Sequence, residues 1–329
     1  MAVYTHLSAD TLEKLIAAYD VGELRSAKGI AEGVSNSNWL VETSEGRFIL
    51  TMYERRIELD ELPYFLGLLD HLAAKDCPVP RTIHDREGAA FRMIDGKAVA
   101  LIEFLPGVSV DRASEAEARS VGAALASIHS ASEDFAPRRK NDLRPSDWQA
   151  LFDQCGEDGL AGIHPDLPAV VERHLPDVMA NWPEHLPQAT IHADLFPDNV
   201  LMLGGKVSGL IDFYFACTDI AAYDLAVTHA AWSFSDETQE FDAATGRGLV
   251  EGYQSSRPLS EEELRALPLL ARGACLRFMA TRAFDWIDTP DTALVKRKDP
   301  MDFARRLQFY TDHGEEIFAS GAKGLSASA

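Results

Sequence analysis

The chain of 329 residues has few basic side chains for its length. It holds 31 Lys and Arg against 52 Asp and Glu, which gives a formal net charge of −21. This balance argues against a protein that binds nucleic acid, because such proteins present a basic surface. It does not favour adsorption to an anionic membrane either. The excess of acid by itself indicates no substrate.

Cysteine is scarce, and long apolar runs are missing. Cys77, Cys155, Cys217 and Cys275 lie far apart and form no C-x-x-C pair, so we expect reduced thiols rather than a metal site or a disulfide framework. No apolar run reaches the roughly 18 residues that suggest a membrane span. The first residues lack the basic and apolar regions of a secretory signal. We therefore expect a cytoplasmic protein, and no feature predicts its oligomeric state.

The length favours two domains, or two lobes with a cleft between them. A hydrophobic content of 46% and a charged content of 25% are typical of globular proteins. Leu105-Pro-Gly107 is the best boundary signal, because Pro and Gly interrupt a regular pattern where the pattern also changes. We expect residues 1–105 to form the first domain and residues 106–329 the second.

The first domain is predicted to be a small antiparallel sheet with one inserted helix. A helix capped by Ser8 precedes the sheet, and apolar residues at helical spacing predict a second helix at 59–74. Short runs rich in apolar and β-branched residues, separated by turn residues, predict the strands. The expected strands are residues 25–31, 38–43, 47–53, 91–94 and 98–104.

The second domain is predicted to be mostly helical, which makes the fold class α+β. We expect the longest helix to break near Pro268, since proline lacks the N–H that an inner turn needs. The expected helices are residues 114–129, 148–154, 169–180, 221–231, 238–255, 261–287 and 303–318.

Two short segments carry most of the chemical information. His192-Ala-Asp-Leu-Phe-Pro-Asp-Asn199 is followed by Leu210-Ile-Asp-Phe213. Strand-like residues precede the first segment, and a Gly-Gly turn joins two further strands before the second. Protein kinases place His, Asp and Asn at this spacing in the catalytic loop, ahead of another Asp that binds metal. The pattern therefore predicts a phosphotransferase.

Each residue type in these segments suits one task in phosphoryl transfer. A hydroxyl nucleophile needs an acceptor for its proton, and we expect Asp194 to be that base. ATP needs Mg²⁺, which prefers oxygen ligands, and Asn199 and Asp212 would supply them. His192 is expected to orient the loop by hydrogen bonds rather than to take the proton. Because Asp and Asn are also common in turns, these roles depend on the flanking strands.

The form of the loop resembles the aminoglycoside phosphotransferase and choline kinase group. Residues 213–226, 271–286 and 294–301 are similar to the bacterial homoserine kinases of this fold, and the resemblance covers nearly the whole chain. It implies a bilobal protein kinase-like fold and ATP-dependent phosphorylation of the L-homoserine hydroxyl in threonine biosynthesis. The alternatives are a choline, ethanolamine or aminoglycoside kinase of the same fold, or a catalytically weak nucleotide-binding protein.

The loop between the first two strands is the expected cover for the phosphates of ATP. It contains Gly33, Ser35, Asn36 and Asn38. Glycine and small polar residues allow close approach of the backbone and supply hydrogen-bond donors. Such clusters are usually plain turns, so the prediction depends on the downstream motif.

The resemblance also implies a hinge strand, at Glu103 and Leu105, whose backbone meets adenine. The chain departs from the kinase pattern on the third strand, where a kinase carries Lys and this chain carries Thr51. Threonine cannot neutralise phosphate charge. Arg55 or Arg56 could reach in from just beyond the strand, although ordinary surface arginines are the simpler interpretation.

Recognition of homoserine requires partners for a carboxylate and an ammonium group. An arginine can bind a carboxylate through two parallel hydrogen bonds. Arg282 and Asp285 lie three residues apart on a predicted helix and can share a face, although a routine ion pair explains that spacing equally well. Asp219 either lines the acceptor pocket or has a structural role. Arg277 is the next candidate for the carboxylate.

Two other polar residues are expected to be structural. Asp224 is predicted to tie the loop after Asp212 to the second domain. His129 is predicted to be a helix residue at a packed face.

Overall fold

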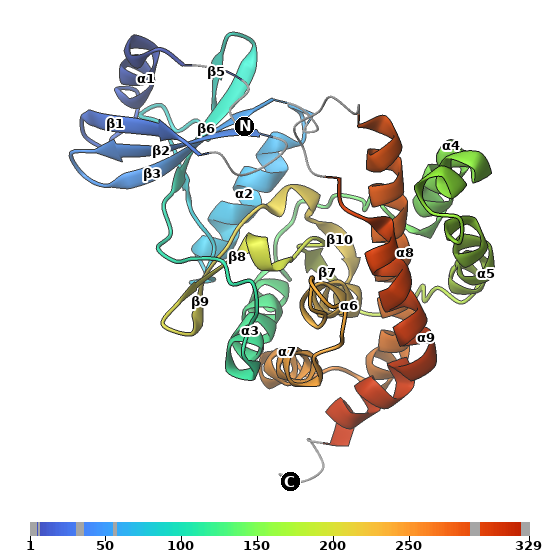
Figure 1. Cartoon of the computed structure of the whole chain (residues 1–329). Helices are drawn as coiled ribbons and strands as arrows, with labels where there is room; N and C mark the ends of the chain where they lie inside the picture. Colours follow the sequence, from blue (N-terminus) through green and yellow to red (C-terminus); the bar gives the residue numbers. More distant parts are fainter. Residues whose placement is uncertain (1–4, 6, 31–35, 55–57, 290–296, 324–329) are drawn as a thin grey trace. The chain divides into compact units, whose positions relative to one another are not determined.

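The computed structural model describes residues 5, 7–30, 36–54, 58–289 and 297–323 (Figure 1). It divides into two compact units. Unit 1 comprises residues 1–107 and 208–214, and unit 2 comprises residues 108–207 and 215–329. Asp212 therefore belongs to unit 1, whereas the segment 192–199 belongs to unit 2.

The described residues of unit 1 form a six-stranded sheet in which every pairing is antiparallel. The strands follow the order β1-β2-β3-β6-β4, and β5 pairs with β6. The bounds are β1 (Leu24–Gly29), β2 (Asn36–Thr43), β3 (Arg47–Tyr53), β4 (Thr82–Ile83), β5 (Arg92–Ile94) and β6 (Lys97–Glu103). The five predicted strands are confirmed; the two-residue β4 is too short to leave a pattern in the sequence.

Two helices of unit 1 pack on the two faces of this sheet. The first, α1 (Ala9–Ile16), is capped by Ser8, whose hydroxyl accepts the Thr11 N–H at 3.1 Å. Its buried residues pack with Leu50 and Leu101 of the sheet. The second, α2 (Leu62–Ala73), packs against Tyr53 and other residues of the opposite face. Strand alternation places Thr51 on the same face as Tyr53.

Unit 2 is mostly helical. Its longer elements are α3 (Glu115–Ala131), α4 (Pro145–Ile163), α5 (Leu167–Ala180), α6 (Ala221–Trp232), α7 (Ala243–Ser256), α8 (Glu261–Asp288) and α9 (Pro300–Lys323). Every residue of α6 is buried, and Figure 1 shows this helix enclosed by α3, α7 and α8. A helix that is apolar all round belongs in a core.

Short strands hold the loop that carries the kinase-like motif. Before the loop lies β7 (Gln188–Ile191), which pairs with β10 (Cys217–Ile220). After it come β8 (Val200–Leu203) and β9 (Lys206–Leu210), which form a hairpin. The predicted strands on both sides of the motif are thus confirmed, whereas β10 was not foreseen.

The predicted break in the helix at Pro268 is wrong. Helix α8 runs through Pro268 without a non-helical residue. A proline inside a helix removes one hydrogen bond, so other contacts must hold the turn. Helix α9 packs closely on this turn, since a Cβ built on Gly314 would be 3.1 Å from the Pro268 Cβ.

Helices α3 and α7 approach each other through their backbones. Gly122 of α3 and Gly252 of α7 lie at the contact. A Cβ built on Gly252 would be 2.0 Å from the carbonyl oxygen of Arg119, and one built on Gly122 would be 2.0 Å from that of Leu249. Glycine is required at both positions because no side chain fits between the helices.

We predict that Gly252→Ala destabilises the protein and that Gly162→Ala does not. Overpacking costs about 1–3 kcal/mol, and the backbone of Arg119 cannot move as a flexible side chain would. Gly162 of α4 has no heavy atom within 4 Å of its built Cβ, so alanine there stabilises a helix by roughly 0.5–1 kcal/mol. Urea denaturation of both variants measures the difference. Equal midpoints for the two would contradict the close approach of α3 and α7.

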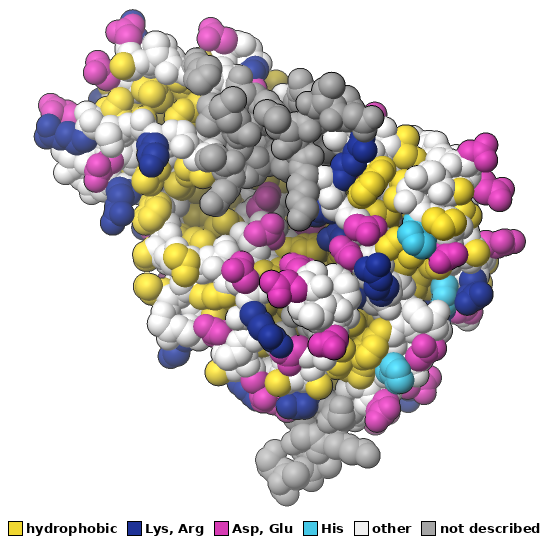
Figure 2. Space-filling view, viewed as in Figure 1, with side chains coloured by type: hydrophobic (Ala, Val, Ile, Leu, Met, Phe, Trp, Pro, Cys, Tyr) yellow, Lys and Arg dark blue, Asp and Glu magenta, His cyan; other side chains and the backbone are white. Residues whose placement is uncertain are grey.

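The described part of the chain contains no helix long and apolar enough to cross a membrane. Figure 2 shows acidic and basic side chains interspersed on one face of the molecule.

Candidate active site

A buried carboxylate holds the backbone of the motif loop in unit 2. Asp224, in the first turn of α6, accepts the N–H of His192 and the N–H of Ala193, each at 2.7 Å. It also contacts His129 Nε2 at 2.9 Å, and His129 Nδ1 lies 2.8 Å from the Tyr253 hydroxyl. Burial alone would raise the pKa of Asp224, but the hydrogen bonds from His129 and the loop keep that pKa below its usual value.

This arrangement changes two expectations. The hydrogen bonds of Asp224 go to the loop before Asp194, not to the loop after Asp212. His129 does pack on a buried helix face, but it is also the partner that orients Asp224. The sequence contains a weak signal for it, namely a histidine among apolar residues of a predicted helix, which needs a buried polar partner.

Ala193 has a strained backbone that is held from both sides. Its φ is +65°, in the left-handed region that residues with a side chain rarely adopt. Its N–H donates to Asp224, and its carbonyl accepts a hydrogen bond from Arg277 Nη1 of α8. Strain of this kind persists only where the surroundings fix it, and it clusters at functional sites.

Asp194 follows this strained residue. Its side chain is 22% exposed, and its Oδ1 lies 3.7 Å from Arg277 Nη2. Burial raises the pKa of Asp194, while the charges of Arg277, His192 and Lys298 oppose that rise. The Asp194 N–H donates to His192 Nδ1 at 3.2 Å. His192 was expected to orient the loop through hydrogen bonds, and this is a bond of that type.

Asn199 ends the loop in the short 3₁₀ helix η1 (Pro197–Asn199). Its Nδ2 donates to the carbonyl oxygen of Asp194 at 2.8 Å, which uses the donor end of the amide. The loop is fastened again where Trp232 Nε1 donates to the Leu195 carbonyl at 2.8 Å. The carbonyl end of the Asn199 amide is the kind of oxygen ligand that Mg²⁺ takes.

Asp212 lies in unit 1 and also has a left-handed backbone, with φ of +67°. The segment around it is anchored within that unit. Leu210 N–H donates to the Pro78 carbonyl at 2.7 Å, and the hydroxyls of Tyr214 and Tyr53 lie 3.0 Å apart. The amide oxygen of Asn199 and the carboxylate oxygens of Asp212 are ligands that suit a hard cation. Asn199 belongs to unit 2 and Asp212 to unit 1.

The predicted phosphate loop is only partly described, because Gly33 and Ser35 lie outside the described residues, as do Arg55 and Arg56. Asn36 and Asn38 begin β2. Within the described chain, the buried Asn36 Oδ1 has no hydrogen-bond partner. Asn38 Oδ1 accepts the Thr51 hydroxyl at 2.9 Å across the β2–β3 pair.

Lys97 of unit 1 does not take the place of the lysine that kinases carry on the third strand, where this chain has Thr51. Lys97 of β6 forms an ion pair with Glu54. Alternation along β6 puts Lys97 on the face of Val99, which packs with α1. Thr51 lies opposite Ala100, on the other face of the sheet.

The expected hinge residues lie at the end of β6. The Glu103 carboxylate accepts two hydrogen bonds from the Arg81 guanidinium, each at 3.1 Å, and these lower the pKa of Glu103. Glu103 and Leu105 line a cavity of about 340 Å³ together with Cys77 and Val79. The contact of their backbone with adenine stays a prediction.

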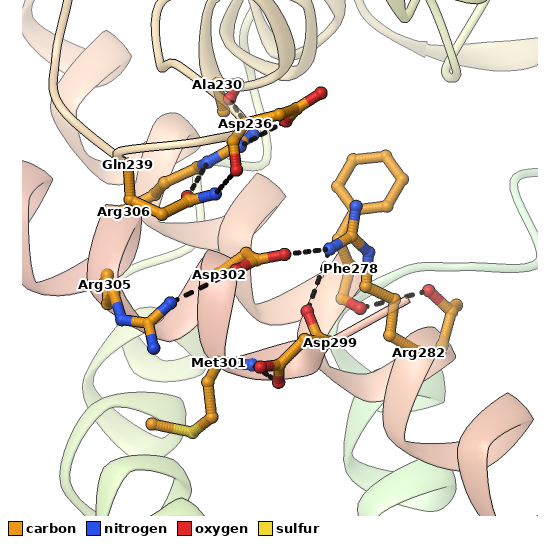
Figure 3. A network of polar contacts seen from close by, with 11 residues as sticks. Ala230, Asp236, Gln239, Phe278, Arg282, Asp299, Met301, Asp302, Arg305 and Arg306 are labelled. Atoms are coloured by element: carbon orange, nitrogen blue, oxygen red, sulfur yellow. Dashed lines mark hydrogen bonds and ion pairs between the residues drawn. The ribbon is translucent and has the colours of Figure 1, made fainter. Parts of the chain in front are cut away.

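Arg282 contacts residues other than Asp285, with which it was expected either to line the acceptor pocket or to form a routine ion pair. Arg282 Nη1 donates to the Asp299 carbonyl at 2.9 Å and lies 3.3 Å from Asp302 Oδ2 (Figure 3). Asp285 is exposed. Asp302 comes from the first turn of α9, which packs along α8, so a partner distant in sequence replaces the one three residues away. Burial, with the nearby charge of Arg306, lowers the pKa of Arg282.

Asp219 is buried and engaged within unit 2. Its Oδ2 accepts Asn141 Nδ2 at 2.8 Å and lies 4.0 Å from Arg144 Nε, and its Oδ1 accepts the Ile220 N–H. These contacts favour the structural alternative for Asp219.

Lys298 is a candidate for binding the acceptor carboxylate that the sequence did not reveal. It lies just before α9, and its Nζ is 5.6 Å from the centre of the Phe196 ring in the motif loop. Its charge acts on Asp194, yet it makes no ion pair with any described residue. The signal was present, because Lys298 belongs to the segment 294–301 that resembles the homoserine kinases.

Comparisons with known proteins give the wider context. Residues 26–259 match the model of the phosphotransferase enzyme family. The homoserine kinase of Acidiphilium cryptum is 49% identical over 314 residues, which are 95% of this chain and 98% of that protein. The homoserine kinase of Rhodospirillum rubrum is 47% identical over 326 residues, 99% of this chain and all of that protein.

Among solved structures, a spectinomycin phosphotransferase in complex with ADP and spectinomycin superposes with a TM-score of 0.70. The match covers 97% of this chain and 99% of that one, at 12% sequence identity. Such a distant likeness shows the fold alone. The predicted α+β, protein kinase-like fold with a sheet-based first part and a helical second part is confirmed.

Proposed function

The chain belongs to the phosphotransferase enzyme family and, within it, to the homoserine kinases, and on that premise we propose that it transfers the terminal phosphate of ATP to the hydroxyl of L-homoserine. The observation that carries the proposal is the loop of unit 2, in which Asp194 follows a strained residue held by Asp224 and Arg277. A loop fixed in this way presents one carboxylate in one position, which is what a positioned base requires.

In this proposal Asp194 accepts the proton of the homoserine hydroxyl. The hydroxyl oxygen then bonds to the terminal phosphorus of ATP, the bond from that phosphorus to ADP breaks, and the proton stays on the Asp194 carboxylate. Asp194 is partly exposed, so a small acceptor can reach it. Its raised pKa makes it a stronger base than an ordinary carboxylate at the pH of the cell.

Asn199 and Asp212 would hold the Mg²⁺ that accompanies ATP. Both side chains offer oxygen atoms, the kind of ligand that Mg²⁺ prefers. Held there, the metal would neutralise charge on the phosphates. Asn36, Asn38, Gly33 and Ser35 stay our candidates for the phosphate-covering loop.

For the acceptor carboxylate, the contacts favour Lys298 over Arg282. Arg282 already has a carboxylate and a carbonyl as partners, whereas Lys298 has no ion pair within the described chain. The charge of Lys298 also acts on Asp194, which favours a lysine near the proposed base as the partner of the acceptor carboxylate. Asp285 and Asp219 stay weaker candidates for the ammonium group.

The test of the function is a coupled assay of ADP release with homoserine, choline, ethanolamine and kanamycin as acceptors. We expect turnover with homoserine that requires Mg²⁺. Asp194→Asn keeps the shape of the side chain but removes the carboxylate, so kcat should fall by about 10²–10⁴-fold with little change in nucleotide affinity. Faster turnover of another acceptor would overturn the proposed substrate, and a fully active Asp194→Asn variant would overturn the base.

We predict that Lys298→Met selectively impairs homoserine. A hydrogen bond to a charged group contributes roughly 1.5–3 kcal/mol, so kcat/KM for homoserine should drop about 10- to 150-fold. The acceptor 3-aminopropanol lacks the carboxylate and should lose far less.

Arg282→Lys is the matched comparison for this test. Because Arg282 joins α8 to Asp302 of α9, its replacement should affect both acceptors alike through the fold. A loss selective for homoserine in Arg282→Lys, with none in Lys298→Met, would return the carboxylate to Arg282.

A further inference from the structure

We propose that Phe196 is a positioning residue for the acceptor, because its ring holds the ammonium group of Lys298 where that group binds the carboxylate of homoserine. The motif loop thus both presents the base and determines the preference for an acceptor with a carboxylate. This inference rests on the proposed function and on the role given there to Lys298.

Phe196 belongs to a cluster of three aromatic rings in unit 2. Its ring centre lies 4.9 Å from that of Phe278 of α8 and 6.2 Å from that of Phe303 of α9. The two ring pairs are edge-to-face, with interplanar angles of 86° and 66°. Aromatic pairs prefer this geometry, so the two helices give the ring of Phe196 a defined orientation.

Among the described residues, four cations lie over the rings of this cluster. All are within the distance of about 6 Å at which the quadrupole of a ring attracts a positive charge. They are Arg277 over Phe278, Arg282 and Arg306 over Phe303, and Lys298 over Phe196, at 4.4, 4.6, 4.7 and 5.6 Å from the ring centres.

Two of these cations are bound to other parts of unit 2 (Figure 3). Arg282 lies 3.3 Å from Asp302 Oδ2. Arg306 Nη1 donates to the Ala230 carbonyl at 2.9 Å, and its Nη2 lies 3.3 Å from Asp236 Oδ1. Their positive charges are therefore used within the protein.

Lys298 differs from the three arginines of the cluster. The third arginine, Arg277, is buried and donates to the Ala193 carbonyl, as a buried charge needs a partner. Lys298 is exposed, and it makes no ion pair or hydrogen bond with the described residues. The cluster therefore leaves one cation available for an anion from solution.

The ring of Phe196 and the proposed base belong to the same turn. The Phe196 N–H donates to the Asp194 carbonyl at 2.9 Å, and Asn199 Nδ2 donates to the same oxygen at 2.8 Å. Because the turn is fixed, the ring determines how far Lys298 stands from Asp194. That spacing selects an acceptor that carries its hydroxyl and its carboxylate at the two ends of a short chain.

We predict that Phe196→Leu, which keeps an apolar side chain but removes the ring, weakens the preference for homoserine over 3-aminopropanol. The ratio of the two kcat/KM values should fall by about 2- to 5-fold, the size of an exposed cation–π contact. General damage to the fold lowers both values and leaves their ratio unchanged. Phe196→Tyr keeps an aromatic face and should restore most of the ratio.

Phe309→Leu is the matched control. Phe309 of α9 is also half-buried and packs on the rings of Phe234 and Phe241, but among the described residues no cation lies over it. This variant should keep the parental ratio.

A double-mutant cycle tests whether the ring acts through the lysine. In the background of Lys298→Met, Phe196→Leu should change the ratio no further. Equal falls in the two backgrounds would overturn the inference, because the ring would then act without Lys298. A parental ratio in Phe196→Leu alone would overturn it as well.

A second measurement does not depend on activity. The face of an aromatic ring shields nearby protons, so the ¹H–¹³C spectrum of the protein with labelled lysine should show the methylene beside the Lys298 ammonium group displaced upfield. Lys298→Met assigns this signal by removing it, and Phe196→Leu should return it toward the other lysines. A Lys298 signal with no upfield displacement in the parent would overturn the inference even if Phe196→Leu does not fold.

The outcomes separate the inference from the proposed function. If the parent phosphorylates homoserine but Lys298→Met keeps the parental ratio, the inference is overturned and the proposed reaction stands. If the parent does not phosphorylate homoserine, the proposed function fails and the acceptor role of Phe196 fails with it.

Discussion

The candidate active site depends on one buried carboxylate. Asp224 receives two backbone N–H groups of the motif loop and the imidazole of His129, all within unit 2. A buried charge is costly unless it is fully hydrogen-bonded, and here the polar backbone of a loop supplies the bonds. The loop and the carboxylate therefore stabilise each other, since neither has a comparable partner without the other.

This interaction explains why a non-glycine residue can adopt the backbone of Ala193. The N–H of its peptide is held from α6, and its carbonyl is held from α8 by Arg277. Helix α3 contributes His129 and α7 contributes Tyr253 behind it. Elements far apart in the sequence converge on a few loop atoms and so define the position of the next residue, Asp194. Burial at that position raises the pKa of Asp194.

The order and class of the elements, and the motif itself, were predictable because they depend on local patterns. Strand alternation identified β2, β3 and β6, and the spacing within the segment 192–199 identified the loop. The continuity of α8 through Pro268 was not predictable, because proline locally disfavours an inner turn and the packing of this turn against Gly314 joins two different helices. The same holds for Arg282, whose partner Asp302 lies 20 residues further along the chain.

The least predictable part of the site was the set of buried residues that hold the loop by hydrogen bonds. A residue such as Asp224 has no spacing rule that links it to His192, because the hydrogen bonds join residues 32 positions apart. Thr51 shows the opposite case. Its position in the sheet was predictable, and its bond to Asn38 follows from the register of β2 and β3, which places the two residues opposite each other.

The central claim is that the Asp224 carboxylate fixes the loop that presents Asp194. Asp224→Asn tests it most directly, because it keeps the size of the side chain but leaves one oxygen to accept hydrogen bonds from two N–H groups. We expect faster hydrogen exchange at the His192 and Ala193 amides, and a fall in kcat of about 10- to 150-fold, the size set by the loss of hydrogen bonds to a charged group. Parental protection of both amides together with parental kcat would contradict the account.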